Sequence, residues 1–250
     1  MTATSERHSG FAVRERCYDQ VLPSDARPEL IVDVGGIYDS TGWLRERFPS
    51  ARIVTTNVRQ EDLDPIPDKW ADKRLGRAEE LTDLSDVDLI FLGEVLEHLV
   101  YPNEFIEQAV RLLRPGGLLL LSTPNLASWH NRILMLLGYS PSNYSMMPGR
   151  HLGVPRRLAK RAGNGYGDHI RVFTYRALKQ LFSESPWELV GIAGQVVLGF
   201  DRPFYRSRNA ISNAIPASAR ESVFVCARLV TKEIDQVSSI GFIGSSALPA

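Results

Sequence analysis

Residues 87–123 constrain the fold more than any other part of this sequence, because two apolar runs flank a helical pattern. The runs, 87–92 (VDLIFL) and 118–121 (LLLL), are short and continuous, as in strands buried on both faces of a parallel sheet. Between them, apolar residues recur at helical spacing over 103–114, and Pro-Gly-Gly at 115–117 stops the helix. A strand, a helix and a strand form a right-handed crossover unit, so the pattern predicts an open α/β sheet.

The alternation of strands and helices continues on both sides of this unit. We predict five further strands, at 30–34, 52–56, 73–75, 187–192 and 222–229. We predict helices at 11–22, 42–48, 126–137 and 174–183, with Thr174 as the N-cap of the last one. The last two strands are expected to pair antiparallel at an edge of the sheet, and the helix at 11–22 is expected to cover a sheet edge.

These elements suggest a division of the chain. Residues 1–27 are expected to form an N-terminal helical cap, 28–231 the main domain and 232–250 a weakly ordered tail. We expect an insertion at about 126–172, after the fifth strand. Its part at 138–167 is rich in Gly, Pro, Ser, Asn and Arg and is too long for an ordinary connection, so we interpret it as a functional lid.

Composition excludes several classes of protein. A hydrophobic content of 44% supplies a substantial core, and a net charge of zero gives no global attraction to nucleic acid or acidic membranes. Cys17 and Cys226 lie far apart, so we expect neither a disulfide framework nor a zinc site, and no residue is assigned to a metal. No apolar stretch suits a signal peptide or a membrane span. We therefore expect a soluble, cytoplasmic protein without nucleic acid partners; its oligomeric state stays open.

The sequence of residues 87–125 resembles that of the class I S-adenosylmethionine-dependent methyltransferases. The resemblance lies in D-L-I-x-x-x-E-V-L-E-H-L and, after the helix, in L-x-P-G-G-x-L-x-L-S-T-P-N; it extends more weakly over roughly 28–195. It implies a doubly wound, mostly parallel, seven-stranded Rossmann-like sheet with S-adenosyl-L-methionine as cofactor. It also implies in-line methyl transfer to an oxygen or nitrogen of a small-molecule, glycan or lipid-like acceptor.

Ligands of doubly wound sheets bind at the carboxyl ends of the strands, near the point where the strand order reverses. The resemblance therefore assigns cofactor-binding residues to the ends of four strands. Glycines there let the backbone approach the cofactor closely. The residues are Asp33, Gly35 and Gly36 at the methionine end, Asn57 at the ribose, Ala78 and Glu79 at the adenine, and Gly93 and Glu94 beside the transferring methyl.

Three features depart from the family pattern. The loop after Gly35 reads as a few residues longer than usual, Asn57 replaces a ribose-binding acid, and Arg77 replaces an acid near the adenine. Glu61 and Asp62 are alternative ribose partners. These departures favour an alternative function, a methyltransferase-fold protein without transfer activity that serves as a binding or regulatory partner.

Glu94 also has an alternative reading, as an acid that opens a helix. A nicotinamide-dependent oxidoreductase is disfavoured, because no G-x-G-x-x-G follows the first strand.

Two histidines are candidates for removing a proton from the acceptor. His98 belongs to the E-H pair, and His169 belongs to a segment that resembles the family's H-x-R-x-F-T; either could instead be a structural hydrogen-bonding residue. An apolar helix followed by the basic segment 150–171 suits an amphiphilic or anionic acceptor. The residues assigned to acceptor binding are His130, Arg132, His151, Arg171 and Tyr175.

Overall fold

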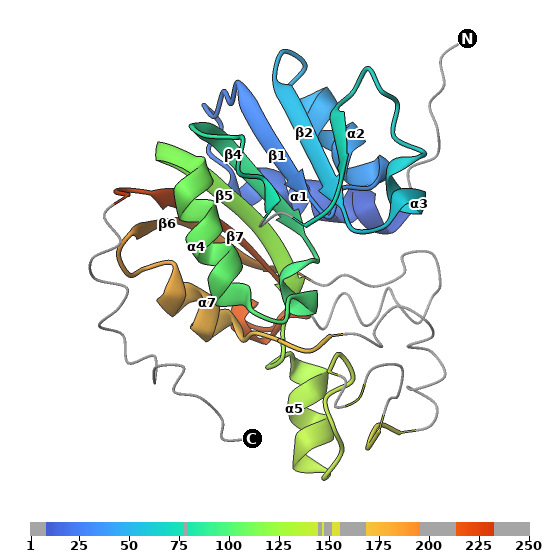
Figure 1. The fold of residues 1–250 in the computed structure, drawn as a ribbon. Helices are drawn as coiled ribbons and strands as arrows, with labels where there is room; N and C mark the ends of the chain where they lie inside the picture. Colours follow the sequence, from blue (N-terminus) through green and yellow to red (C-terminus); the bar gives the residue numbers. More distant parts are fainter. Residues whose placement is uncertain are drawn as a thin grey trace, which may run out of the picture.

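The computed structural model describes residues 9–77, 80–144, 147, 152–155, 169–195 and 214–232 (Figure 1). The helices are α1 (Ser9–Val21), α2 (Tyr38–Arg47), α3 (Gln60–Leu63), α4 (Pro102–Leu112), α5 (Trp129–Leu136) and α7 (Tyr175–Leu181), with the 3-10 helices η2 (Leu96–His98) and η3 (Ala217–Ala219). The strands are β1 (Leu30–Val34), β2 (Arg52–Asn57), β3 (Asp72–Leu75), β4 (Val87–Gly93), β5 (Leu113–Pro124), β6 (Trp187–Gln195) and β7 (Ser222–Leu229).

The strands form one seven-stranded sheet in the order β3-β2-β1-β4-β5-β7-β6. The first five strands of this order run parallel, and β7 is antiparallel to both β5 and β6. The predicted doubly wound, mostly parallel sheet with an antiparallel edge pair is therefore confirmed. The strand order reverses between β1 and β4, so a ligand is expected at their carboxyl ends.

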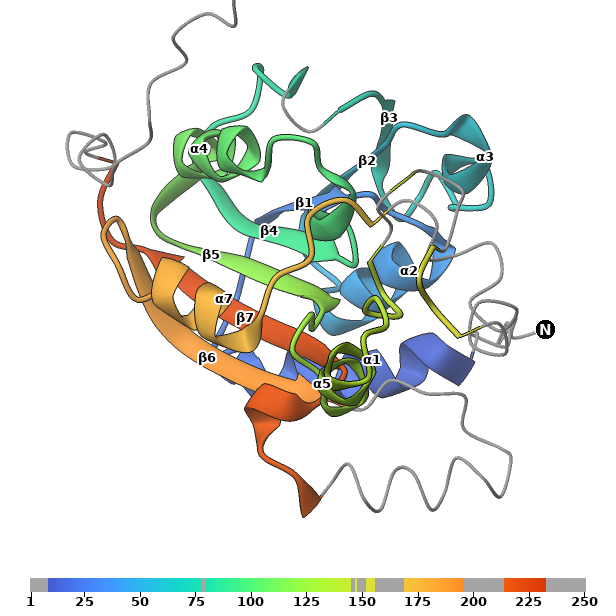
Figure 2. The same ribbon diagram turned by 90° about the horizontal axis from the view of Figure 1, so that it is seen from below.

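Helices cover both faces of the sheet (Figure 2). On one face, Phe105 of α4 and Phe182, the C-cap of α7, share a buried cluster with β-strand residues. On the other face, α1 and α2 meet, and the Tyr18 ring lies 4.8 Å from that of Phe91 and 5.0 Å from that of Phe224. The helix predicted at 11–22 therefore packs on a sheet face beside β6 and β7. This layered burial explains why the central strands are almost entirely apolar.

Several predicted boundaries differ from the structure. The helix predicted at 42–48 begins at Tyr38, so the loop after β1 is short and the prediction of an extended loop was wrong. The helix predicted to reach residue 114 ends at Leu112, where β5 begins. Between 94 and 99 only η2 is helical. The cap prediction is confirmed, because the Thr174 hydroxyl accepts a hydrogen bond from the Ala177 amide at 3.1 Å.

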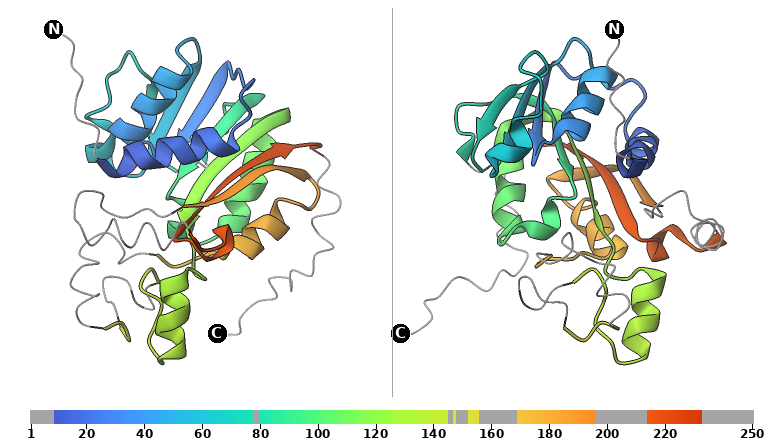
Figure 3. Two further views of the ribbon diagram at one scale, coloured as in Figure 1. Left: turned by 180° about the vertical axis from the view of Figure 1, so that it is seen from behind. Right: turned by 90° about the vertical axis from the view of Figure 1, so that its right-hand side faces the viewer.

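The predicted insertion is described in part. Helix α5 follows β5 and projects away from the sheet beyond the carboxyl ends of the strands (Figure 3). Most of 138–167, including His151 and the basic residues between 156 and 161, lies outside the described residues, as does the predicted tail beyond residue 232. Cys17 and Cys226 are buried thiols. Among the described helices, none has the length and hydropathy needed to cross a membrane.

Candidate functional site

The loop between β1 and α2 lies where the strand order reverses. Its two glycine amides both donate to the Thr56 carbonyl, at 2.8 Å from Gly35 and 3.0 Å from Gly36. Gly35 has φ +69°, and a Cβ there would lie 2.4 Å from Cγ2 of Val95. A Cβ on Gly36 would lie 1.8 Å from the Thr55 hydroxyl. Both positions therefore require glycine, and the loop fits tightly against the ends of β2 and β4.

Asp33 ties β1 to the first turn of α2. Its Oδ2 accepts hydrogen bonds from the hydroxyls of Thr41 at 2.6 Å and Ser40 at 3.2 Å, and the Thr55 hydroxyl lies 3.5 Å away. Burial raises the pKa of Asp33 to about 6, although these hydrogen bonds act to lower it. Its Oδ1 is buried and has no hydrogen-bond partner among the described residues. The described contacts make Asp33 a positioning residue for the loop.

Asn57 bridges the loops after β1 and β2. Its Nδ2 donates to the Gly36 carbonyl at 3.0 Å, and its Oδ1 accepts from the Arg59 amide at 3.0 Å. The alternative ribose acids, Asp62 and Glu61, lie 2.7 and 3.7 Å from the Arg59 guanidinium. An aspartate at position 57 could not donate to Gly36, which gives a structural reason for the amide at this position.

The end of β4 carries an unusual backbone conformation. Glu94 has φ +57°, which is uncommon for a residue with a side chain and marks strained, often functional, positions. Its amide donates to the Ser122 carbonyl at 3.0 Å, and its Oε1 accepts from the Ser122 hydroxyl at 2.7 Å. Arg14 lies 3.5 Å from its other oxygen. Glu94 precedes η2 and its N-cap, Val95, so the alternative reading of Glu94 as an acid in the first turn of a helix is wrong.

Gly93, which precedes Glu94, also lacks space for a side chain. A Cβ there would lie 2.9 Å from the Tyr18 hydroxyl, which itself hydrogen-bonds the Ser122 hydroxyl at 2.8 Å. The close approach of α1 to the end of β4 therefore depends on this glycine.

Exposed apolar side chains also lie at the carboxyl ends of β1, β2 and β3. Ile37, Val58 and Leu75 come after or end β1, β2 and β3, and they are 39, 67 and 60% exposed. An open apolar rim beside a polar loop fits an elongated ligand with a flat apolar part, such as a nucleoside, and a polar part at β1 and β4. Ala78 and Glu79, assigned to the adenine, lie outside the described residues.

Three side chains converge just beyond the end of β4. Nε2 of His169 lies 3.8 Å from Oε1 of Glu97, and Nε2 of His98 lies 4.0 Å from the same oxygen. The two imidazole rings meet edge to face, with centroids 4.7 Å apart. Glu97 and His169 are buried and His98 is exposed. The structure thus brings together the two histidines assigned to catalysis.

Hydrogen bonds hold this cluster from several chain segments. Oε2 of Glu97 accepts from the Thr123 hydroxyl at 3.0 Å, and the Glu97 carbonyl accepts from the Ile170 amide at 3.0 Å. Nδ1 of His169 lies 3.1 Å from the Asn143 carbonyl. Burial, together with the nearby charge of Glu94, raises the pKa of Glu97 well above its ordinary value.

Sequence reasoning did not select Glu97 or Asn143 as site residues. For Glu97 the signal was its place beside His98 in the E-H pair, whereas nothing local in the sequence indicates that Asn143 meets His169.

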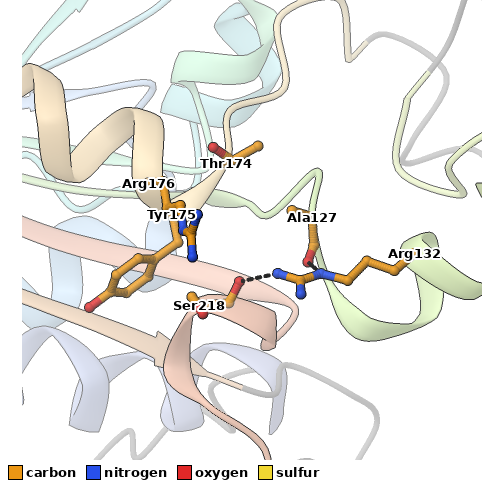
Figure 4. Close-up of a pocket in the computed structure, with 6 residues that line it drawn as sticks. All are labelled: Ala127, Arg132, Thr174, Tyr175, Arg176 and Ser218. Carbon is orange, nitrogen blue, oxygen red and sulfur yellow. Dashed lines mark hydrogen bonds between the residues drawn. The ribbon is translucent and has the colours of Figure 1, made fainter.

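The residues assigned to acceptor binding fall in separate places. Nε2 of His130 lies 3.0 Å from the Ser142 hydroxyl, and its Nδ1 lies 3.7 Å from Glu221. Arg171 is exposed and donates to the Val100 carbonyl at 3.3 Å. Arg132 and Tyr175 line a pocket of about 300 Å³ together with Ala127, Thr174, Arg176 and Ser218 (Figure 4).

Arg132 is held at this pocket by backbone oxygens. Its guanidinium donates to the carbonyls of Ala127 at 2.7 Å and Ser218 at 3.4 Å. Neither His98 nor His169 lines the pocket, so Arg132 and Tyr175 do not form one site with the histidine cluster. Arg171 does lie beside that cluster, because its amide donates to the Glu97 carbonyl at 3.1 Å.

Comparisons with known proteins agree with this arrangement. Residues 15–191 match the model of a methyltransferase domain family. The chain is 28% identical over 127 residues to the mitochondrial ubiquinone biosynthesis O-methyltransferase of Candida albicans, covering 47% of this chain and 39% of that protein. It is 31% identical over 116 residues to the malonyl-[acyl-carrier protein] O-methyltransferase of Hahella chejuensis, covering 41% and 39%. Each match thus spans about two fifths of the relative.

A solved structure shows the same fold. The S-adenosylmethionine-dependent methyltransferase of Mesorhizobium loti superposes with a TM-score of 0.56 at 15% identity, covering 85% of this chain and 96% of that one. The family match covers more than half of the chain, and the sheet order and the loops at the carboxyl ends of β1 and β4 fit it. The chain therefore belongs to the class I S-adenosylmethionine-dependent methyltransferases.

Proposed function

We propose that this chain transfers a methyl group from S-adenosylmethionine to an oxygen or nitrogen of a small-molecule, glycan or lipid-like acceptor, and most simply to a hydroxyl oxygen. The observation that carries this proposal is the cluster of Glu97, His98 and His169 directly after the end of β4. The cluster begins three residues after Glu94, whose strained backbone lies at the expected cofactor edge.

The residues at the strand ends fit the parts of the cofactor. Gly35 and Gly36 let the backbone approach its methionine part, and we assign Oδ1 of Asn57, at the end of β2, to a ribose hydroxyl. The exposed apolar rim of Ile37, Val58 and Leu75 suits the adenine ring. The bound cofactor supplies a methyl group on a positively charged sulfur, already activated for displacement.

The chain's own part in the reaction is alignment and proton removal. A lone pair of the acceptor oxygen forms the new bond to the methyl carbon while the carbon–sulfur bond breaks. The electron pair of the broken bond stays on sulfur. The hydroxyl proton passes to the histidine cluster, where His98 is exposed and therefore the more accessible base, and His169 is buried beside it. Orientation alone contributes roughly 7–11 kcal/mol in reactions of this kind.

The exposed apolar residues of α5, and those that follow it up to Tyr139, support the proposal that the acceptor has an apolar part. Leu136 and Leu137 are 86 and 68% exposed, and Ile133, Met135 and Tyr139 are also exposed. Two relatives are named as O-methyltransferases, one of ubiquinone biosynthesis and one of a malonyl-carrier protein. Together these observations favour a hydroxyl or carboxyl acceptor that carries an extended apolar group. We retain the cytoplasmic location as part of this proposal.

A second candidate is a methyltransferase-fold protein that binds a partner without transferring methyl groups. Asn57 favours it, because both polar atoms of its amide are already hydrogen-bonded within the protein. Cofactor affinity separates the two candidates.

The test has two stages. Titration calorimetry with S-adenosylhomocysteine should show micromolar binding; no binding at millimolar ligand would favour the second candidate. Methyl transfer from labelled cofactor is then measured on hydroxyl, carboxyl and amine acceptors, each with and without a long alkyl chain. We expect transfer to oxygen, faster with the alkyl chain. Cofactor binding without transfer to any acceptor class would contradict the transferase proposal.

A further inference from the structure

We propose that Glu97, His98 and His169 bind one divalent transition-metal ion, such as Zn²⁺, Mn²⁺ or Co²⁺. The sequence had suggested no metal site, because Cys17 and Cys226 lie far apart and have no metal-ligand spacing. The structure places one ligand atom from each of these three side chains within 4.8 Å of the others.

The geometry is close to that of a coordination sphere. Both histidine Nε2 atoms face the same carboxylate oxygen, Oε1 of Glu97, at 3.8 and 4.0 Å. Ligand atoms bound to one tetrahedral ion at about 2.0–2.1 Å lie roughly 3.4 Å from each other. An inward movement of about half an ångström would therefore complete the site, and rotation of the exposed His98 can supply part of it.

These separations do not suit a hydrogen-bonded catalytic dyad. A charge-assisted bond between imidazole and carboxylate would lie at about 2.7–2.9 Å. Here Oε1 of Glu97 is buried without a hydrogen-bond partner among the described residues, although the Nε2 atoms of His169 and His98 lie 3.8 and 4.0 Å from it. A cation between the three groups would compensate the cost of burying that oxygen.

The surroundings of the cluster resemble the outer shell of a metal site. Metal-ligating histidines usually donate their second ring N–H to a carbonyl or carboxylate, which fixes the ring and its tautomer. Nδ1 of His169 lies 3.1 Å from the Asn143 carbonyl. The Thr123 hydroxyl donates to Oε2 of Glu97 and so directs Oε1 toward the histidines.

The ligand set determines the class of ion. Two imidazoles and one carboxylate suit Zn²⁺, Mn²⁺, Fe²⁺ or Co²⁺, whereas Mg²⁺ and Ca²⁺ prefer oxygen ligands. Three protein ligands with further positions open are typical of catalytic sites. His98 is the exposed member, so an ion held by the three side chains would be reached from solvent on the His98 side.

The consequence for catalysis rests on the proposed function. An acceptor hydroxyl bound to the ion would lose its proton more readily, because a divalent cation stabilises the oxyanion. In the metal-bound protein the three side chains would hold the ion in place of accepting the proton, and the hydroxyl proton would leave to solvent.

The experiment measures metal binding directly, without cofactor or acceptor. Untagged, chelator-treated protein is titrated with Co²⁺, and the visible absorption of bound Co²⁺ reports its nitrogen and oxygen ligands. We expect one ion per chain, with Zn²⁺ displacing Co²⁺ and Mg²⁺ competing poorly. Loss of an outer-shell partner already costs about 10–100-fold in metal affinity, so Glu97→Gln, His98→Asn and His169→Asn should each cost at least about tenfold.

The chain offers a matched control. His130 faces Glu221 with Nδ1 3.7 Å from the carboxylate, but no second histidine completes a group there among the described residues. His130→Asn should leave Co²⁺ affinity unchanged. Because the His98 side chain is exposed, His98→Asn should keep the fold, which circular dichroism and a thermal melt will check.

Two results would overturn the proposal. One is the absence of stoichiometric Co²⁺, Mn²⁺ or Zn²⁺ binding by folded wild-type protein. The other is equal Co²⁺ affinity in wild type and folded His98→Asn. Binding of S-adenosylhomocysteine by the metal-free protein is measured separately, so failure of the metal site is distinguishable from failure of the methyltransferase proposal.

Discussion

The carboxylate of Glu97 lies 3.8 Å from Nε2 of His169, although β5 and α5 separate the two residues along the chain. The main chain fixes this proximity, because the Glu97 carbonyl accepts hydrogen bonds from the amides of Ile170 and Arg171 at 3.0 and 3.1 Å. The segment that carries His169 is thereby held against η2. Substitutions at the carboxyl ends of β1 and β2 and at the end of α5 give four testable expectations.

Gly35→Ala should destabilise the protein, because position 35 combines φ +69° with a Cβ position 2.4 Å from Cγ2 of Val95. The left-handed backbone alone costs roughly 1–2 kcal/mol for a residue with a Cβ. Val95→Ala in the same chain should recover the steric part of the loss. Urea denaturation of the two single variants and the double variant measures this coupling; strictly additive effects would contradict the contact.

Asn57→Asp should lower both stability and cofactor affinity. The substitution removes the donor to the Gly36 carbonyl and places a carboxylate oxygen 3.0 Å from it. An unsatisfied buried acceptor costs about 1–3 kcal/mol. Unfolding free energies and calorimetric titration with S-adenosylhomocysteine provide the measurements, with Asn57→Ala as the uncharged control. Tighter binding in Asn57→Asp would instead show that a ribose-binding acid is tolerated there.

Asp33 should make stability depend on pH. Its pKa of about 6 in the folded protein exceeds the ordinary value of 3.8 for an aspartate, so between these values the folded state holds a proton that the unfolded state has lost. The free energy of unfolding should therefore fall as the pH rises from about 4 to about 6. The loss should reach about 3 kcal/mol, since one pKa unit corresponds to roughly 1.4 kcal/mol.

Asp33→Asn tests this assignment. Urea denaturation gives the free energies of unfolding of wild type and variant at pH 4 and at pH 7. Relative to the variant, wild type should be less stable at pH 7 than at pH 4, by about 3 kcal/mol. A difference that is the same at both pH values would show that Asp33 does not titrate in this range.

Leu136→Ser and Leu137→Ser should separate acceptor binding from folding. Both side chains are largely exposed, so each change should alter stability by no more than about 0.5 kcal/mol. If the surface of α5 binds the apolar part of the acceptor, kcat/KM should fall roughly tenfold for alkyl acceptors and stay constant for short ones. Leu134→Ala is the contrasting variant, since Leu134 is buried and its truncation should cost about 2–5 kcal/mol. Equal losses for long and short acceptors would remove α5 from the acceptor site.

The sequence alone determined most of the elements of the fold. The apolar runs at 87–92 and 118–121 lie in β4 and β5, and Thr174 caps α7 as its position before the helix predicts. These features depend on residues close together in the chain, whose periodicity and capping chemistry can be read directly. The motif in 87–125 likewise predicted the family and the parallel sheet.

Only the tertiary structure decided where the site's side chains lie. Helix α2 begins at Tyr38 rather than near Gly42, because the Ser40 and Thr41 hydroxyls bond Asp33 on the neighbouring strand. Glu97 and His169 meet through backbone hydrogen bonds between distant segments. Such contacts leave no periodic trace in the sequence, because their partners are set by sheet order and by the packing of loops at the strand ends. The sequence could therefore predict the sheet edge at which a ligand binds, whereas the convergence of Glu97, His98 and His169 followed only from the folded chain.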